Sequence, residues 1–413
     1  MNATDSLSSD ARALAAGLGA RGWPRRIVLV TGPGDVVGTF THWRAGRDDP
    51  SIPNIGYSHQ IYDAAAALDV PLLTIAEQAS ETDPPDERFS FDAVAPPSGR
   101  GVRHHLREIA YLLGLVQRAW REGADILMLQ RMSLHFYALA PALLLGMTLV
   151  LSLHNTFWAM GKAPSAKLRP LFWLSGRLMR CRRVIVLAAS PEIERQATAV
   201  SGRRPRQMAL HLPQYAADRL PARPDEAPTG PPMIVFVGRV TVEKGVFLLL
   251  EAFETVRKRH PEARLVYAGD GAALESLRDA VARSPCQNAV ELLGQVDGDA
   301  VFTLLSQATL LACPTLAGFP EGLAQTPLEA ALAGVPSVVS DVVPVAEIMG
   351  DAVAVHPEGD ANALAETIDT ILADPARHAA MRTAGLEIRA TLTDRSLSSS
   401  SRLLSLLSQE AAR

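Results

Sequence analysis

Two glutamates and two cations are the side chains whose spacing could do chemistry. Glu321 and Glu329 have seven residues between them in GFPEGLAQTPLEAALAGVPSVVSD, the first in a loop bounded by Gly and Pro and the second in the first turn of a predicted helix. Arg239 and Lys244 stand in GRVTVEKG, which follows an apolar strand and precedes a helix predicted at 246–259. Cations beside the free N–H groups of a helix amino end form a natural receptor for a diphosphate.

Local patterns predict the elements that position Glu329. An apolar run ending near Cys313 predicts a strand. Thr326 is interpreted as a helix N-cap, with Pro327 at the first helical position and Glu329 closing a capping box. Gly334 would end that helix before the next strand. Loops of this kind lie at the carboxyl ends of the strands in an open α/β sheet, where ligands bind. Glu329 is thus a helix cap or a ligand-binding carboxylate.

The whole stretch resembles the EGxxxxxxE region of the retaining glycosyltransferases of the GT-B fold, family 4, the glycogen synthase and sucrose synthase type. GRVTVEKG likewise matches the G-R-x-x-x-x-K-G of that family. The chain departs from the family's pattern at Leu323-Ala324, where Phe-Gly is usual, and in a longer approach loop at 316–320. The matching residues of the first motif are Pro314-Thr315, Glu321-Gly322, Leu328-Glu329-Ala330 and Gly334-Val335-Pro336.

This resemblance implies an α/β fold of two doubly wound, Rossmann-like domains that face each other across a cleft. It also implies a retaining, metal-independent hexosyltransferase that uses a nucleoside-diphosphate sugar and no cofactor. The acceptor would be a glycan, a lipid-linked sugar or a small molecule. Arg239 and Lys244 would stabilise the charge that develops on the departing pyrophosphate, in place of a metal. Glu321 would lie beside the donor sugar, and Glu329 would accept the ribose hydroxyls.

Loops facing these glutamates supply further candidates. His154 ends the apolar run 148–154; such a histidine is commonly a satisfied, half-buried residue, but the resemblance implies a catalytic one at this strand end. Asp297-Gly298-Asp299 is interpreted as a helix N-cap rather than a metal-binding D-x-D, so no metal ligand is assigned. The predicted donor-binding residues are Gly238, Gly322, Leu323 and Ala324 in the second domain and Gly32 and Gly34 in the first.

Gly32 and Gly34 follow the strand predicted at 26–30. Together with Gly38 they suggest a dinucleotide-binding fingerprint, but the third glycine comes one residue late and no helix is predicted to start at once. A loop open to a substrate is favoured. We expect the loops 31–58 and 79–101 to select the acceptor, the second being rich in Pro, Asp and Glu and predicted to be solvated and mobile.

Composition limits the class of protein. The chain has 413 residues, of which 48% are hydrophobic and 20% charged, which predicts two or three globular domains. A net charge of -4 and a pI near 6.2 argue against a nucleic-acid partner. Three separated cysteines imply neither disulfides nor zinc, and favour a reducing cytoplasm. Neither a signal peptide nor a transmembrane helix is expected.

Five segments are predicted along the chain. Residues 1–22 form a flexible leader, 23–210 an N-terminal Rossmann-like acceptor domain and 211–232 a linker rich in Pro and Arg. Residues 233–390 form a C-terminal Rossmann-like nucleotide-sugar domain with five strands. By resemblance, the helix at 391–413 packs back on the N-terminal domain.

The basic segment 156–183 has two interpretations. It carries seven cations and no acidic residue, interleaved with aromatic residues that include Phe157, Phe172 and Trp173. It is either a helix with an apolar core face and a solvated basic face, or an amphipathic helix that lies on an anionic membrane. The second interpretation would place a cytoplasmic protein peripherally at the inner face of the membrane.

Two other functions stay open. One is a nucleotide-sugar epimerase or phosphorylase on the same scaffold, which would act on the donor alone or require inorganic phosphate. The other is a catalytically silent nucleotide-sugar-binding module that serves polysaccharide biosynthesis as a scaffold. The cations Arg239 and Lys244 argue against the silent module, because a module that breaks no bond has no need of groups that stabilise a leaving phosphate.

Overall fold

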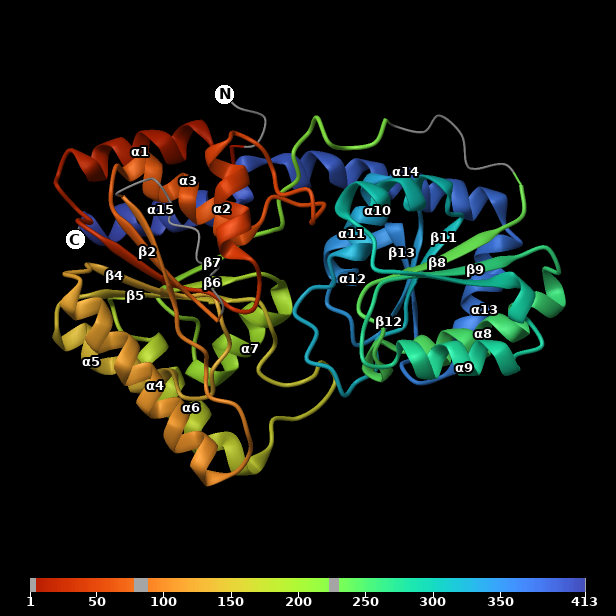
Figure 1. Cartoon of the computed structure of the whole chain (residues 1–413), viewed down its shortest axis with the longest axis horizontal. Helices are drawn as coiled ribbons and strands as arrows, with labels where there is room; N and C mark the ends of the chain where they lie inside the picture. The colour runs from red at the N-terminus through yellow and green to blue at the C-terminus, as the bar shows by residue number, and fades with distance from the viewer. Residues whose placement is uncertain (1–4, 78–87, 223–229, 413) are drawn as a thin grey trace.

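Two α/β domains lie side by side in the computed structural model, which describes residues 5–77, 88–222 and 230–412 (Figure 1). The first domain is built on a seven-stranded sheet of order β3-β2-β1-β4-β5-β6-β7. Every neighbouring pair is parallel. The strands are β1 (Ile27–Val30), β2 (Leu72–Ala76), β3 (Phe89–Ala93), β4 (Ile126–Leu129), β5 (Thr148–Leu153), β6 (Val184–Ala188) and β7 (Gln207–Leu210).

The second domain repeats this plan with six parallel strands in the order β10-β9-β8-β11-β12-β13. Two doubly wound parallel sheets confirm the predicted fold class. The strands are β8 (Met233–Val237), β9 (Arg264–Ala268), β10 (Val290–Gly294), β11 (Leu310–Cys313), β12 (Ser337–Ser340) and β13 (Val353–His356).

Helices cover both faces of each sheet (Figure 1). Those of the first domain are α1 (Ser9–Gly19), α2 (Val36–Arg44), α3 (Tyr57–Leu68), α4 (Val102–Arg121), α5 (Ala140–Leu144), α6 (Arg169–Met179) and α7 (Pro191–Ser201). Those that follow are α8 (Val246–Arg259), α9 (Leu274–Arg283), α10 (Gly298–Gln307), α11 (Thr326–Leu332), α12 (Ala346–Met349), α13 (Ala361–Leu372), α14 (Pro375–Thr393) and α15 (Ser399–Ala411).

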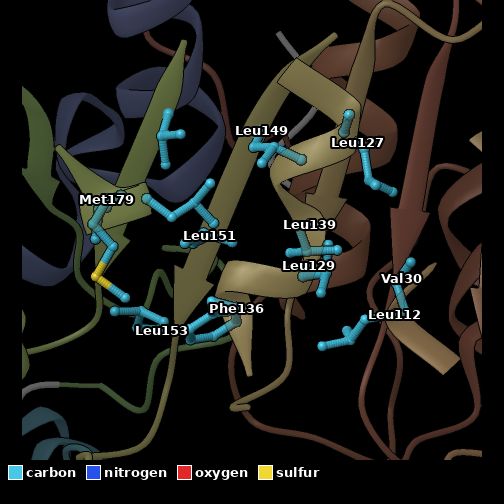
Figure 2. Close-up of a cluster of buried hydrophobic side chains, with 14 of the residues drawn as sticks. Val30, Leu112, Leu127, Leu129, Phe136, Leu139, Leu149, Leu151, Leu153 and Met179 are labelled. Carbon is cyan, nitrogen blue, oxygen red and sulfur yellow. The ribbon is translucent and has the colours of Figure 1, made fainter. Parts of the chain in front are cut away.

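Successive side chains of a strand point to opposite faces of the sheet, and this divides the first domain's core into two clusters. Val28 and Val30 of β1 pack on the side of α4, α5, α6 and α7, whereas Ile27 and Leu29 pack on the side of α1, α3 and α15. Figure 2 shows the first cluster, in which strand residues such as Leu129 and Leu151 meet helical side chains. Because both faces are buried, the central strands are continuous apolar runs, which is why they could be located in the sequence.

The predicted flexible leader requires a correction. Residues 9–19 form helix α1, which packs against α15 and α3. Its Ala11, Ala15 and Leu18 are buried, and the Ser8 side chain caps the helix by accepting from the Ala11 N–H. These apolar residues on one face hold the helix on the domain, so residues 9–19 are an ordered layer of the fold rather than the flexible segment that was predicted, and residues 1–4 lie outside the described part of the chain.

Three strands were missed by the sequence analysis, and each lies at an edge. β3 falls within the predicted mobile loop 79–101, of which residues 79–87 lie outside the described part of the chain. β7 lies at the end of the predicted N-terminal domain, directly before the predicted linker, and β13 adds a sixth strand to the second sheet where five were predicted. Edge strands bury less of their surface, and these have no long apolar run to reveal them.

Helix α2 is a further correction. It follows the turn at 31–34 almost at once, because the Asp35 side chain caps it by accepting from the Gly38 N–H at 2.8 Å. Its β-branched residues, Val36, Val37 and Thr39, disfavour a helix intrinsically. Their burial against the domain is what stabilises it.

The chain crosses between the domains twice, and the two crossings lie together. Helix α14 leaves the second domain, and α15 then packs on α1, α3 and β6 of the first, as the resemblance implied (Figure 1). The linker runs beside this return: the Leu212 N–H donates to the Leu397 carbonyl at 2.9 Å, and the Tyr215 N–H donates to the Leu392 carbonyl at 3.1 Å.

Candidate active site

The GRVTVEKG loop brings its two cations to the carboxyl edge of the second sheet. It begins after β8, makes one 3-10 turn at Val242–Lys244, and enters α8 through Gly245. Gly245 has φ 72°, and a Cβ there would lie 2.0 Å from the Pro314 carbonyl oxygen. Glycine is therefore required both for the backbone conformation and for the close approach of Pro314, which directly follows β11.

A cavity of about 250 Å³ lies between the two domains at this edge. Its lining combines second-domain loops with Tyr57 and His154 of the first domain. The predicted residues that it brings together are Gly238, Arg239, Lys244, Glu321, Leu323, Ala324 and His154.

An ion pair and an aromatic ring organise the charged side of this cavity. Lys244 pairs with Glu321, and both side chains are largely buried, at 15% and 10% exposed. The Thr315 hydroxyl also donates to Glu321, at 3.5 Å. Lys244 and Arg239 both lie over the Phe319 ring, 4.6 and 5.3 Å from its centroid. The ring therefore holds the two cations close together, since each is attracted to its face.

Phe319 was not identified from the sequence. It stands in the approach loop, 316–320, whose extra length was noted only as a departure from the family. An aromatic residue directly before Pro-Glu-Gly was the signal available. Its role depends on the fold, which brings the Phe319 ring against Arg239 and Lys244.

The loop after Glu321 is shaped by two backbone constraints. A Cβ on Gly322 would lie 1.8 Å from the His154 carbonyl oxygen, so the second domain touches the first at this point through bare backbone. Ala324 has φ 60°, which is uncommon for a residue with a side chain. It occupies the position where the resembled family has glycine, so the loop keeps a glycine-like conformation without the glycine.

His154 stands directly after β5 and is neutral at physiological pH. Burial lowers the pKa of its imidazole to about 4. Its Nε2 and the Ser152 hydroxyl form a hydrogen bond of 3.0 Å. The His154 ring lies 4.2 Å from the Tyr57 ring and 5.5 Å from the His211 ring, centroid to centroid. An uncharged ring can exchange hydrogen bonds with sugar hydroxyls without bringing a charge into the cavity.

Tyr57 and His211 complete this aromatic group and were both missed by the sequence analysis. The Tyr57 hydroxyl is hydrogen-bonded to Gln325 of the second domain, and burial raises its pKa. His211 is fully buried, which lowers its pKa well below the ordinary value, and the neighbouring His154 lowers it further. Neither residue stands in a motif; Tyr57 follows Gly56 at a helix start, and His211 follows the edge strand β7.

Gly32 and Gly34 line a neighbouring cavity of about 320 Å³ rather than the cavity of the cations. Tyr57 and His154 line both. The two cavities thus adjoin at this pair of rings, one against the cations of the second domain and the other within the first domain.

Glu329 takes a position that differs from the predicted capping box. The N-cap of α11 is Gln325, and Thr326 instead donates its hydroxyl to the Val237 carbonyl at 3.1 Å. The Glu329 side chain is 5% exposed and is not among the described residues that line the cavity. The Tyr215 hydroxyl donates to it at 3.5 Å, and burial raises its pKa to about 7. The capping box is therefore wrong, because this carboxylate turns into the protein instead of back to the helix end.

We expect Glu329→Gln to stabilise the protein at alkaline pH. The folded-state pKa of about 7 lies above the ordinary 4.5, so the folded protein holds a proton that the unfolded chain releases. The contribution of this group to stability falls as pH rises between those values. The free energy of unfolding of the variant, measured in urea, should rise relative to that of wild type by on the order of 3 kcal/mol as the pH is raised from 5 to 8.

Glu251→Gln, at an exposed position of α8, is the matched control for that measurement. The difference between variant and wild type should be the same for this control at both pH values. A Glu329→Gln difference that is equally independent of pH would contradict the assignment of a buried, protonated carboxyl.

The acidic residues of Asp297-Gly298-Asp299 have structural partners. Asp297 caps α10 by accepting from the Ala300 N–H at 2.7 Å, which confirms the predicted N-cap. Asp299 pairs with Arg219 at 3.0 Å. Across the described ranges, no group of three or more His, Cys, Asp or Glu side chains is arranged to hold a metal ion.

Comparisons with known proteins show a match to one family over part of the chain. Residues 221–387 match the family described as glycosyl transferases group 1. An uncharacterized glycosyltransferase of Methanocaldococcus jannaschii is 34% identical over 145 residues, which are 34% of this chain and 36% of that protein. A glycogen synthase of Mycobacterium tuberculosis is 27% identical over 216 residues, 49% of this chain and 51% of that protein. The chain thus spans about half, or less, of the length of these curated relatives.

Similar solved structures extend over nearly the whole chain. The Anabaena protein HepE in complex with UDP has a TM-score of 0.65 at 16% identity and covers 94% of this chain and 100% of its own. Sucrose-phosphate synthase from Thermosynechococcus elongatus has a TM-score of 0.66 at 15% identity, with 94% and 98% covered. Residues 221–387 thus match the glycosyl transferases group 1 family, and the chain as a whole has the two-domain GT-B fold.

Proposed function

We propose that this protein is a glycosyltransferase that moves a sugar from a nucleoside-diphosphate sugar to an acceptor. The observation that carries the proposal is the convergence of Arg239, Lys244, Glu321 and His154 on one cavity between the domains. The first three lie within the segment that matches the glycosyl transferases group 1 family. Two cations and a carboxylate on one cavity wall fit a ligand that is anionic at one end and hydroxylated at the other.

The chemistry follows from the charge that develops during the reaction. As the bond between the anomeric carbon and the diphosphate breaks, negative charge grows on the leaving oxygen, so Arg239 and Lys244 interact most strongly in the transition state. Because the Phe319 ring positions both cations beforehand, little reorganisation is needed at that moment. These two fixed cations would perform the task of a metal ion, so the proposal includes metal-independent transfer.

Glu321 and His154 would hold the donor sugar. Glu321 is fixed by Thr315 and Lys244, and its carboxylate oxygens can accept hydrogen bonds from sugar hydroxyls. His154, neutral and fixed by Ser152, faces it from the first domain. The backbone N–H groups of Gly322, Leu323 and Ala324 would complete the donor site. Retention of the anomeric configuration belongs to the proposal through the resemblance to retaining enzymes.

The acceptor would enter from the neighbouring cavity. That cavity meets the donor cavity at Tyr57 and His154, so a hydroxyl there would lie next to the anomeric carbon. We therefore assign Gly32 and Gly34 to the acceptor side of the junction. Glycan, lipid-linked and small-molecule acceptors all belong to the proposal, as does peripheral membrane contact through residues 156–183.

The test combines ligand binding with turnover. Structures of HepE contain UDP and UDP-glucose, and a mannosyltransferase of Corynebacterium glutamicum that is 33% identical over 159 residues is described as GDP-mannose-dependent. A thermal-shift screen should therefore include UDP and GDP. A ligand present at about 100 times its Kd adds roughly 2.7 kcal/mol to the stability of the folded state.

The nucleotide that binds then defines the sugar nucleotides to assay with a panel of acceptors. Transfer that requires an acceptor supports the proposal, and NMR of the product gives its anomeric configuration. Turnover of the donor alone to an isomer, or turnover only with inorganic phosphate, would replace it with an epimerase or a phosphorylase. Binding without turnover under any of these conditions would indicate a silent module.

A further inference from the structure

Large hydrophobic side chains that remain exposed are concentrated on one layer of the first domain. Of twelve such residues in the described ranges, eight lie on α4, on α5 with its C-cap, and on α6. Their exposed fractions run from 37% for Leu174 to 89% for Leu144. The eight residues are Val102, Leu106, Leu113, Trp120, Leu144, Leu145, Trp173 and Leu174.

These three helices share one side of the sheet, so their exposed residues share one outer surface. Leu112 of α4, Ala142 of α5 and Phe172 of α6 belong to the same core cluster. Figure 1 shows the three helices together below the first sheet, away from α1 and α15. On α4 the exposed Val102, Leu106, Leu113 and Trp120 recur at intervals of four and seven residues, which form one stripe along the helix. We name this surface the α4–α6 face.

The exposed charged side chains of α4 and α6 are all positive, although one of them, Arg118, pairs with Asp92 and Glu122 outside these helices. The exposed residues of α4 and α6 include the cations Arg103, Arg107, Arg121, Arg169 and Arg177. Within the three helices, all of whose residues are described, Glu108 is the one acidic residue. It is buried and accepts from the Ser133 hydroxyl at 3.0 Å. The outer surface of these helices therefore carries apolar side chains and cations. None of the acidic side chains of the same helices is exposed there.

We infer that the α4–α6 face docks on the surface of an anionic lipid bilayer. A bilayer accepts both components, because the apolar stripe can enter the boundary between headgroups and acyl chains while arginines bind lipid phosphates. A second copy of this chain would set cations against cations. A nucleic acid would match the charge, but it would leave Val102 and Leu106, 75% and 62% exposed, against polar phosphates.

The structure also revises which residues make this contact. Of the aromatic residues expected to anchor the segment 156–183, Phe157 and Phe172 are buried in the core. Trp173 is 57% exposed, with the Arg177 guanidinium 5.0 Å from its ring centroid. The apolar stripe comes instead from α4, which lies outside that segment. None of the helices in the described ranges is both long and apolar enough to cross a bilayer.

Flotation of the full-length protein with vesicles tests this inference without reference to glycosyl transfer. The protein should float with vesicles of phosphatidylcholine and phosphatidylglycerol, and far less with phosphatidylcholine alone. Leu106→Gln with Leu113→Gln should weaken binding to the anionic vesicles by roughly tenfold or more, since two insertable side chains are lost. Arg103→Gln with Arg107→Gln should weaken it by about tenfold, and added salt should reproduce that loss.

Two second-domain variants are the matched controls. Leu293 is 42% exposed, as Leu113 is, and Arg283 is an exposed arginine, so Leu293→Gln and Arg283→Gln should float like wild type. The thermal shift with UDP or GDP should be unchanged in all four variants, which confirms that each is folded and separates this inference from the proposed function.

Three outcomes would overturn the inference. The first is a wild-type protein that does not float with anionic vesicles. The second is equal binding to neutral vesicles. The third is a concentration-dependent dimer in sedimentation, formed without vesicles and abolished by the double leucine variant, which would assign the face to a second copy of the chain.

Discussion

Lys244→Ala is expected to lower the kcat/KM of sugar transfer by a factor of roughly 10²–10³. The side chain lies at the cavity with its ammonium over the Phe319 ring and paired with Glu321. In the proposed mechanism it stabilises charge that exists only after the glycosidic bond begins to break. Its loss should therefore reduce kcat as well as donor affinity. Initial rates across donor concentrations separate the two effects.

Removing Lys244 also leaves Glu321 without its cation. The Glu321 side chain is 10% exposed, so part of any lost activity could come from lost stability. The double variant Lys244→Met with Glu321→Gln removes both charges and separates the two causes, because it should restore the melting temperature without restoring transfer. Lys258→Ala, at the exposed far end of α8, is the matched lysine control. Transfer by Lys244→Ala within about threefold of that control would refute the assigned role.

Gly322→Ala should lower transfer by about 10²-fold although it adds a single methyl group. The new Cβ would lie 1.8 Å from the His154 carbonyl oxygen and 2.7 Å from its carbon, contacts that cannot form. Because the obstacle is backbone of the other domain, it can be relieved only if the cleft opens or the loop after Glu321 shifts. Either change moves donor-binding groups by an ångström or more, and small-angle scattering would detect an opened cleft.

The neighbouring Gly318 provides the control for this substitution. It stands in the same loop, and a Cβ there meets nothing within 4 Å. Gly318→Ala should therefore transfer sugar at nearly the wild-type rate. If the two alanine variants behave alike, the contact between Gly322 and His154 has no part in assembling the site. The nucleotide thermal shift should persist in both variants, since the cations are untouched.

How far the sequence predicts this fold depends on how each strand is buried. Central strands such as IVLV at 27–30 are apolar at every position, because helices cover both faces, and these were found. The edge strand FSFDA at 89–93 keeps only Phe89 buried, so it carries no such run. Helix α2 was missed for the opposite reason: Val36 and Val37 favour a strand locally, and tertiary burial outweighs that preference.

The site residues that could be predicted are those whose chemistry requires a fixed spacing along the sequence. Arg239, Lys244 and Glu321 stand in motifs with fixed offsets from helix starts, and the structure brings all three to one cavity. Tyr57, at the start of α3, and Phe319, in the loop before Glu321, reach the same group from positions at no fixed distance from any motif. Their roles depend on which ring meets which cation or histidine after folding, and a linear pattern does not encode that contact.

Two covalent connections run between the halves of the molecule, hydrogen-bonded to each other at Leu212 and Tyr215. A single connecting segment would allow the two domains to rotate against each other in any direction. Two connections that lie side by side and are hydrogen-bonded to each other would restrict the rotation of one half against the other to fewer directions. We therefore expect the path of the backbone to keep His154 of the first domain and the cations of the second on the same cavity.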